Sequence, residues 1–198
     1  MIAKKSLQFI ISPILLAVFF WGVKLIPLSI LFFSLSLFCL FFFRDPTRKI
    51  GSEIVAPADG RIMDISESEG ETRIAIFMNM FNVHVNRMPI DGEILGIERI
   101  RGKHAMAFLT KASENSRLKI HLDTVIGEIT IVQIAGVFAW RIVPYITKGQ
   151  MLKKGERIGI IRFGSRVDIF LPTQKTEVSV RLHQRVKAGF STLAHIKK

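Results

Sequence analysis

The chain has little cysteine, one tyrosine, and no acidic residue in its first 44 positions. A single Cys, at position 39 of 198 residues, excludes an internal disulfide framework and any zinc site built from clustered cysteines. The single Tyr, at position 145, and the small number of aromatic residues among the basic ones leave few surfaces on which bases could stack. This composition disfavours a nucleic-acid partner.

Several familiar catalytic signatures are also missing from the chain. No glycine-rich loop ends in Lys-Ser or Lys-Thr, which excludes a phosphate-binding loop of the usual form. Neither His-Glu-x-x-His nor Gly-x-Ser-x-Gly occurs, and the five histidines do not show the spacing of metal ligands. We therefore predict no metal site and no hydrolase of the kinds that these motifs mark.

Long apolar runs dominate residues 1–43. Residues 7–23 and 25–43 contain no charged side chain, and Lys24 separates the two runs. Each run approaches the roughly 20 apolar residues that span a hydrocarbon core about 30 Å thick. We predict a membrane hairpin with its turn around Lys24. A shallow insertion into one leaflet and a cleaved signal peptide are the alternatives, because prolines interrupt both runs.

Basic residues flank the predicted hairpin on both sides. They are Lys4 and Lys5 before it, and Arg44, Arg48 and Lys49 after it. By the positive-inside tendency, both ends of the hairpin lie in the cytoplasm. The net charge of +12 favours contact with anionic lipid, which contributes about 1 kcal/mol per Lys or Arg near the surface. We predict a protein at the cytoplasmic face of the cell membrane.

Residues 44–198 follow a different pattern. Short runs alternate apolar and polar side chains between Gly, Pro, Asn and Asp, as in 61–65, 73–77 and 128–132. Such period-2 alternation predicts half-buried strands. Residues 102–115 fit a helix or an ordered loop better, and no long amphipathic helix occurs. We predict a mainly β (α+β) fold, a small β-barrel-sandwich-like domain preceded by a hydrophobic helical hairpin.

A Gly-Ser pair, Gly164 and Ser165, lies between two strand-like runs. Glycine tolerates a tight backbone, in which the serine oxygen can approach the preceding carbonyl carbon. Gly-Ser is also common in ordinary turns, so the pair alone defines no function.

Five stretches of this chain, in order, resemble the phosphatidylserine decarboxylase family. Residues 163–172, Phe-Gly-Ser-Arg-Val-Asp-Ile-Phe-Leu-Pro, are similar to the family's maturation site in its short Phe-Gly-Ser form. The other four are Phe-Arg-Asp-Pro at 43–46, Ala-Pro-Ala-Asp-Gly at 56–60, Phe-Asn-Val-His-Val-Asn-Arg-Met-Pro at 81–89 and Val-Gln-Ile-Ala-Gly at 132–136. Each motif is weak alone, whereas five in the family's order are specific.

The resemblance implies a proenzyme that cleaves itself between Gly164 and Ser165. The Ser165 hydroxyl attacks the Gly164 carbonyl to give an ester, since a serine activated by a base can act as a nucleophile. Elimination then leaves dehydroalanine, which hydrolyses to a pyruvoyl group and ammonia. The expected products are a large subunit, residues 1–164, and a small pyruvoyl subunit, residues 165–198, as partners in the mature enzyme.

The resemblance also implies a substrate and a cofactor. The expected cofactor is the pyruvoyl group derived from Ser165, without a metal. The amino group of phosphatidylserine forms a Schiff base with the pyruvoyl ketone, and the adjacent carbonyl accepts electrons as CO₂ leaves. The product is phosphatidylethanolamine, so the implied enzyme is a pyruvoyl-dependent carboxy-lyase of phospholipid biosynthesis. The expected partners are phosphatidylserine and an anionic membrane, and not nucleic acid.

By the same resemblance, Asp59 and His84 supply acid–base catalysis beside Ser165. Asp59 matches the Asp of the family's Pro-Ala-Asp-Gly turn, and His84 lies in the segment before Met-Pro. Other members have His-x-x-His there, whereas Arg87 stands at the second position in this chain. Arg87 could bind the lipid phosphate or the substrate carboxylate. The group that replaces the second histidine is left open.

Two non-enzymatic functions stay open on the residues alone. A membrane-anchored, lipoyl-like β-sandwich adaptor would use the Lys-Gly and Asp-Gly turns and needs no reactive serine. A membrane-tethered nucleic-acid binder would use the net positive charge, and its binding would depend steeply on salt. The adaptor would stay one intact chain, whereas the proenzyme would give two fragments.

Overall fold

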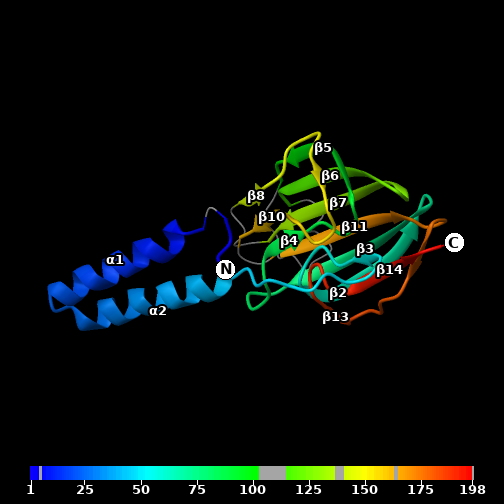
Figure 1. Ribbon diagram of the computed structural model, residues 1–198. Coiled ribbons are helices and arrows are strands. Elements are labelled where there is room, and N and C mark those ends of the chain that lie inside the picture. Colours follow the sequence, from blue (N-terminus) through cyan, green and yellow to red (C-terminus); the bar gives the residue numbers. More distant parts are fainter. Residues whose placement is uncertain (5, 103–114, 137–140, 163–164, 198) are drawn as a thin grey trace. The chain divides into compact units, whose positions relative to one another are not determined.

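The chain consists of two compact units, Met1–Thr47 and Arg48–Lys198 (Figure 1). The computed structural model describes all residues except 5, 103–114, 137–140, 163–164 and 198. Most of 102–115, the stretch that we expected to be a helix or an ordered loop, therefore lies outside the described residues.

The first unit is a helical hairpin. Helix α1 (Gln8–Gly22) and helix α2 (Ile26–Phe42) are joined by a short turn in which Lys24 adopts a positive φ of 61°. Pro27 lies in the first turn of α2, where a missing backbone N–H leaves no helical hydrogen bond unmade. Among the described residues, neither helix combines the length and the apolarity needed to cross a bilayer.

Two serine hydroxyls join the helices of the hairpin. Ser29 donates to the carbonyl of Ala17 at 2.8 Å, and Ser36 donates to the carbonyl of Ile10 at 3.0 Å. The outward surfaces of both helices are apolar, with large exposed side chains that include Leu15, Val18, Phe19, Trp21, Ile30, Leu31 and Phe33.

The second unit is built around one eight-stranded antiparallel sheet, here called the main sheet. Its spatial order is β13 (Arg185–Val186), β2 (Gly60–Ser68), β3 (Glu71–Met78), β11 (Ser165–Pro172), β7 (Gly127–Ala135), β6 (Arg117–Thr124), β5 (Gly92–Ile100) and β9 (Met151–Leu152). Figure 1 shows β11 between β3 and β7, in the middle of this sheet. The predicted mainly β class is confirmed.

Two three-stranded antiparallel sheets complete the second unit. One has the order β1 (Ile54–Val55), β14 (Thr192–Ile196) and β12 (Thr176–Val178). The other has the order β4 (Val85–Arg87), β10 (Arg157–Ile161) and β8 (Ile142–Pro144).

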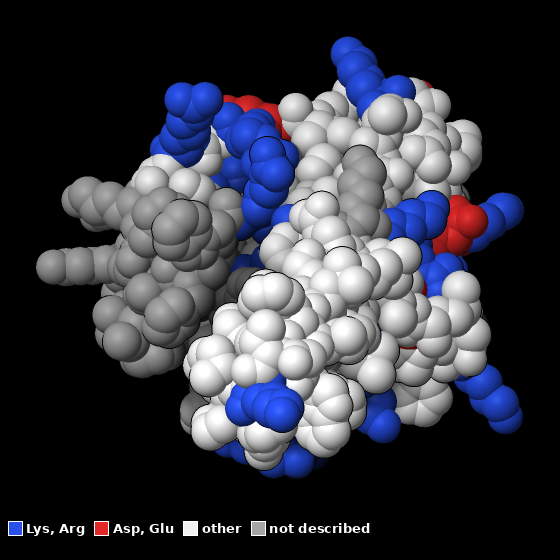
Figure 2. Space-filling view, turned by 90° about the vertical axis from the view of Figure 1, so that its left-hand side faces the viewer, with Lys and Arg blue, Asp and Glu red and all other residues white. Residues whose placement is uncertain are grey.

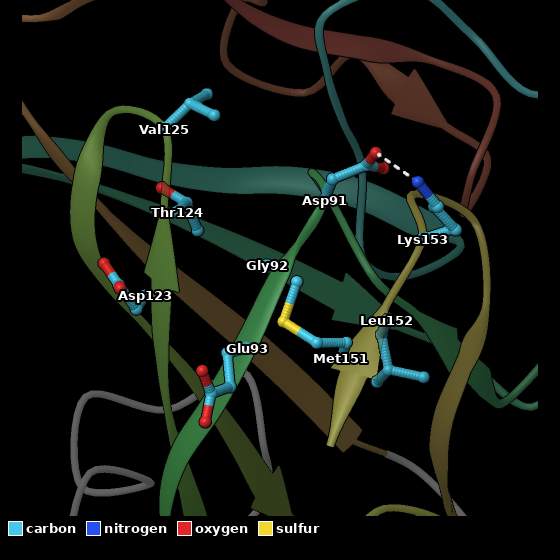
Figure 3. Close-up of a pocket in the computed structure, with 9 residues that line it drawn as sticks. All are labelled: Asp91, Gly92, Glu93, Asp123, Thr124, Val125, Met151, Leu152 and Lys153. Atoms are coloured by element: carbon cyan, nitrogen blue, oxygen red, sulfur yellow. Dashed lines mark ion pairs between the residues drawn. The ribbon is translucent and has the colours of Figure 1, made fainter. Parts of the chain in front are cut away.

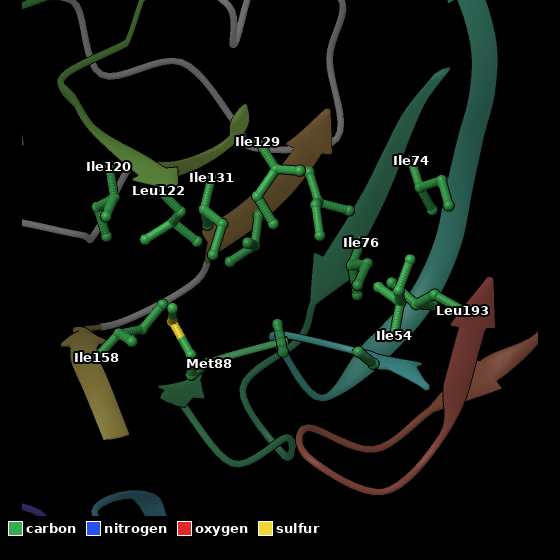
Figure 4. Close-up of a cluster of buried hydrophobic side chains, with 14 of the residues drawn as sticks. Ile54, Ile74, Ile76, Met88, Ile120, Leu122, Ile129, Ile131, Ile158 and Leu193 are labelled. Atoms are coloured by element: carbon green, nitrogen blue, oxygen red, sulfur yellow. The ribbon is translucent and has the colours of Figure 1, made fainter. Parts of the chain in front are cut away.

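The core of the second unit is rich in isoleucine and draws side chains from all three sheets (Figure 4). Strand β6 shows how the pattern produces burial: Leu118, Ile120 and Leu122 are buried, whereas the alternate residues Lys119 and His121 are partly exposed. Burying one such aliphatic side chain contributes about 1.5–3 kcal/mol. This alternation fixes which face of each strand meets the core.

The register of the main sheet gathers several chain segments at one end. Ser165 at the start of β11 lies opposite Met78 at the end of β3 and opposite Ala135 at the end of β7. Strand β2 also begins at this end, because Arg61 pairs with Phe77. Ser165 itself and the turn that carries Asp59 therefore lie at the same end of the sheet, here called the Ser165 end.

Candidate active site

Ser165 is the first residue of β11, and none of its surface is exposed to solvent. Its hydroxyl donates a hydrogen bond to the sulfur of Met78 at 3.3 Å. In the described part of the chain this sulfur is the hydroxyl's one hydrogen-bond partner. Gly164, the other half of the predicted cleavage bond, lies outside the described residues.

Met78 connects Ser165 to two buried amide side chains. Nδ2 of Asn86, on β4, lies 3.7 Å from the Met78 sulfur, and Oδ1 of Asn86 accepts a 2.6 Å hydrogen bond from Nε2 of Gln133, on β7. All of these side chains are fully buried. Oε1 of Gln133 has no hydrogen-bond partner among the described residues, and such a buried acceptor costs about 1–3 kcal/mol.

Asp59 lies in the turn before β2 and is held by a nearly buried ion pair. Arg48 donates two hydrogen bonds to its carboxylate, from Nη1 to Oδ1 at 2.5 Å and from Nη2 to Oδ2 at 2.8 Å. The backbone N–H of Ala188 also donates to Oδ1, at 2.8 Å, and Arg48 donates to the Ala188 carbonyl at 3.1 Å. Asp59 therefore joins the two pieces that cleavage before Ser165 would produce.

His84 directly precedes β4 and is completely buried. Its Nδ1 lies 2.9 Å from the carbonyl oxygen of Asn82, so Nδ1 carries a proton and Nε2 is the proton-accepting atom of the neutral ring. The backbone N–H of Ile161 donates to the His84 carbonyl at 3.3 Å. Since Ile161 is four residues before Ser165, this contact brings the backbone of His84 towards the Ser165 end.

Arg87, at the end of β4, is buried, with 5% of its surface exposed. Its Nη1 donates to the Gly155 carbonyl at 2.9 Å. Its backbone N–H donates to the carbonyl of Pro57 at 2.8 Å, which ties β4 to the turn that carries Asp59. In this structure the guanidinium that we predicted to bind substrate is directed at the protein backbone.

The residues predicted to act together share the Ser165 end but do not form one hydrogen-bonded group in the described structure. Strand β3 separates β11 from β2, so Ser165 and the turn of Asp59 are two strand spacings apart, about 10 Å. The hydroxyl of Ser165 is bonded to Met78 rather than to Asp59 or His84.

A buried positive charge precedes Ser165 in the chain. Arg162 is three residues upstream, with 8% of its surface exposed, and its backbone N–H donates to the Arg141 carbonyl at 3.3 Å. Burial lowers the pKa of the Arg162 guanidinium, the hydroxyl of Tyr145 raises it, and the charge of Arg141 lowers it again. Because arginine keeps its charge at any physiological pH, a positive charge is buried three residues before Ser165 in the chain.

An ionic ladder lies on the other face of the same strands. Arg166 binds both oxygens of Asp168 at 2.6 Å, and both side chains are nearly buried. Arg73, on β3, lies 3.4 Å from Asp168 and 3.1 Å from Asp64, on β2. The ladder ties the first residues of β11 to β3 and, through Arg73, to β2.

A pocket of about 460 Å³ opens at the opposite end of the main sheet (Figure 3). Its wall includes Thr124, which pairs with the first residue of β7, whereas Ser165 pairs with the last, about 26 Å further along the strand. Figure 3 shows the carboxylates of Asp91, Glu93 and Asp123 around it, and Asp91 is paired with Lys153 at 3.6 Å. This pocket is therefore separate from the predicted site. Within the described residues, no three His, Cys, Asp or Glu side chains are grouped to hold a metal ion.

Sequence reasoning missed Met78, Asn86, Gln133 and Arg48. Asn86 and Gln133 lie within the motifs at 81–89 and 132–136, where a polar amide in an apolar strand was the available signal. No local pattern pairs Arg48 with Asp59.

The fold and the site define a class of protein: a mainly β domain with a fully buried serine at the start of a central strand. Residues 35–194 match the family model described as phosphatidylserine decarboxylase. The chain belongs to the phosphatidylserine decarboxylase family.

Three curated relatives illustrate the extent of the similarity. The relative from Syntrophus aciditrophicus is 42% identical over 97% of this chain and 96% of its own length. The relative from Streptomyces griseus is 43% identical over 87% of this chain and 79% of its own length, and that from Streptomyces coelicolor is 46% identical over 78% and 71%. All three are named phosphatidylserine decarboxylase proenzyme, so the comparisons give no support to the non-catalytic adaptor.

Proposed function

We propose that this chain is a phosphatidylserine decarboxylase proenzyme, which cleaves itself between Gly164 and Ser165 and then converts phosphatidylserine to phosphatidylethanolamine and CO₂. The complete burial of Ser165 carries the proposal. In the uncut chain, a hydroxyl with no exposed surface cannot meet an external substrate, whereas its attack on the carbonyl of the preceding peptide bond closes a five-membered ring. Membership of the family supports the same reaction.

Self-cleavage consumes only one water molecule. Attack of the Ser165 oxygen on the Gly164 carbonyl carbon moves the acyl group from nitrogen to oxygen. β-Elimination then breaks the Cβ–Oγ bond and releases the large piece as a carboxylate. Water replaces the nitrogen of the remaining dehydroalanine, so ammonia leaves and a ketone remains. Asp59 and His84 are the residues that we propose to move the protons.

The Ser165 end suits a pyruvoyl group. The register places Ser165 between Met78 and Ala135, so a methyl group at the position of the serine Cβ would have apolar neighbours. The pyruvoyl group supplies the electron sink for loss of CO₂. Arg162 attracts the substrate's carboxylate or phosphate, and Nε2 of His84 handles the proton for the carbon that loses CO₂.

The two pieces would stay together after self-cleavage. Residues 165–198 contain β11, which is hydrogen-bonded to β3 on one side and β7 on the other. They also contain β13 and β14, which pair with β2 and β1 of the large piece. The small piece thus contributes strands to the main sheet and to the sheet formed by β1, β14 and β12.

We also propose that the α1–α2 hairpin holds the enzyme at a lipid surface, at the cytoplasmic face of the membrane. Large apolar side chains are exposed on both helices. Figure 2 shows a face of the molecule on which Lys and Arg are far more frequent than Asp and Glu, as contact with anionic lipid requires. Because the substrate is a lipid, tethering raises its effective concentration at the enzyme.

Intact-mass measurement and a denaturing gel test the proposal directly. We expect wild-type protein to yield residues 1–164 and a blocked fragment from 165–198, and the variant Ser165→Ala to stay whole. Ser179→Ala, which removes an exposed hydroxyl from the same fragment, is the control and should still be cleaved. Cyanoborohydride should fix phosphatidylserine onto the short fragment. Active protein that proves to be a single chain with an ordinary serine would refute the proposal.

A further inference from the structure

Two buried amides and a methionine sulfur lie beside Ser165 in an otherwise apolar core. Met78, Asn86 and Gln133 come from three different strands, and each is completely buried. Hydrogen bonds connect them in series, from Gln133 to Asn86 at 2.6 Å, from Asn86 to the Met78 sulfur at 3.7 Å, and from the Ser165 hydroxyl to the same sulfur at 3.3 Å.

Stability does not explain this arrangement. Oε1 of Gln133 is buried without a hydrogen-bond partner among the described residues. An apolar pair of similar size could fill the space of Asn86 and Gln133 without burying an unsatisfied acceptor. The amides therefore have another use, and the group at the end of the series is the reactive serine.

We propose that Met78, Asn86 and Gln133 are positioning residues for self-cleavage, which hold the Ser165 hydroxyl in the orientation from which its oxygen attacks the preceding carbonyl. This inference rests on the proposed self-cleavage of the chain. It assigns to the three residues a role before the cut, when the hydroxyl still exists.

The chemistry of a thioether suits such a role. Sulfur accepts a hydrogen bond weakly, so it orients the O–H bond while the oxygen lone pairs stay available for attack, and it releases the proton to the base when the oxygen attacks. Without that acceptor, the serine side chain is free to occupy its other staggered rotamers.

The amides are needed because methionine is flexible. Its unbranched side chain has three rotatable bonds and adapts easily to its surroundings. Asn86 fixes the position of the Met78 sulfur by donating to it, and Gln133 fixes Asn86. Gln133 therefore acts on Ser165 only through the side chains of Asn86 and Met78. The effect of replacing Gln133 should accordingly depend on the presence of Asn86.

The test measures the rate of self-cleavage during cell-free synthesis, followed on denaturing gels, for Met78→Leu, Asn86→Leu and Gln133→Met. We expect each variant to cut at least about tenfold more slowly, since small misplacements of reacting groups cost up to about 100-fold. Met88→Leu is the matched control, because Met88 is equally buried in the core but, within the described part of the chain, its side chain has no hydrogen bond that leads to Ser165. It should cut at the wild-type rate.

Two further readouts separate positioning from a loss of structure. Cleaved enzyme no longer has the hydroxyl, so the rate of self-cleavage should fall by a larger factor than the turnover per cleaved chain. In addition, Gln133→Met should slow an Asn86→Leu protein no further. Equal losses in both rates, or additive effects of the two amide substitutions, would contradict the inference.

Met78→Leu nearly conserves volume and carries the test if an amide variant fails to fold. A Met78→Leu protein that cuts as fast as Met88→Leu overturns the inference and leaves the proposed function intact, provided that Ser165→Ala stays whole. A Ser165→Ala protein that is still cut overturns both.

Discussion

The pair formed by Arg48 and Asp59 is a nearly buried ionic contact at the Ser165 end. The two side chains are about one-tenth exposed, and two charge-assisted hydrogen bonds join them. Removing one member of a buried pair leaves the other charge uncompensated, which typically costs about 3–5 kcal/mol. The stability of the second unit should therefore depend on Arg48.

We predict that Arg48→Met lowers the free energy of unfolding by about 3 kcal/mol, and that Arg48→Lys lowers it less, because lysine keeps the charge but loses the forked geometry. Urea unfolding in a Ser165→Ala background measures this on an uncut chain. Arg61→Met, which removes an exposed arginine from β2, is the control. Equal stability of Arg48→Met and Arg61→Met would show that the pair contributes nothing.

His84 is the residue for which we expect the largest loss of activity. Nδ1 donates a hydrogen bond to the Asn82 carbonyl, so Nε2 is the ring nitrogen that we propose for proton transfer. Losing a general acid or base typically costs about 100- to 10,000-fold. His84→Gln should reduce CO₂ release per cleaved chain by at least about 100-fold. His121→Gln is the matched control, since His121 lies partly exposed on β6 and bonds to Glu128 and Thr130. Comparable losses in the two variants would remove His84 from the mechanism.

At the scale of elements, one carboxylate links the start of β1 to β14. Glu53, the residue before β1, accepts hydrogen bonds from His195 and from the backbone N–H of Ile196. A backbone hydrogen bond from Ile196 lowers the pKa of Glu53, and so does His195, while partial desolvation opposes them. A lowered pKa means that the ionised form stabilises the fold. This contribution is complete above the ordinary value of 4.5 and is lost as the pH falls through the lowered pKa.

We therefore predict that Glu53→Gln melts at a slightly lower temperature than the wild type at pH 7, and that the difference shrinks only below about pH 4.5. Thermal unfolding at a series of pH values, again with Ser165→Ala, gives the two curves. Glu177→Gln serves as control, because Glu177 is exposed on the neighbouring strand β12. A difference that grows as the pH falls would have the wrong sign.

The hairpin gives a second prediction at this scale. Leu15 and Leu31 are more than half exposed, on α1 and α2 respectively. A lysine in a bilayer core costs about 2.5–3.5 kcal/mol, so replacing both leucines with lysine should reduce binding to phosphatidylserine vesicles by more than about tenfold. Flotation measures the bound fraction. Leu182→Lys, an equally exposed leucine in the second unit, should float like the wild type. Unchanged flotation of the double variant would refute the lipid contact.

Strands could be predicted from the sequence because a strand that buries one face has apolar side chains at alternate positions. The runs at 61–65, 73–77 and 128–132 lie in β2, β3 and β7. The pairing of β3 with β11 could not be predicted, since its paired residues are 87 to 101 positions apart in the chain and no local pattern encodes it.

At the scale of the whole molecule, the candidate site also combines residues that local sequence motifs predict with contacts that no local pattern predicts. Ser165, Asp59 and His84 could be proposed from the sequence because they belong to motifs with a fixed local order. The partner of Asp59, Arg48, could not be predicted. Arg48 donates hydrogen bonds both to Asp59 and to the carbonyl of Ala188, which is 140 residues away from it in the chain. Contacts of this kind exist only in the assembled unit.

The assembled unit also determines how the cleaved enzyme unfolds. Its two pieces are held by sheet pairing rather than by a peptide bond, and the removal of β11 would split the main sheet between β3 and β7. Unfolding of the cleaved form therefore releases two chains, and mass action makes its midpoint depend on concentration. The urea midpoint of cleaved protein should fall when the protein is diluted, whereas that of Ser165→Ala should not change. Native mass spectrometry should find both pieces in one complex at neutral pH. Pieces that separate without denaturant would show that β11 does not hold its place once the chain is cut.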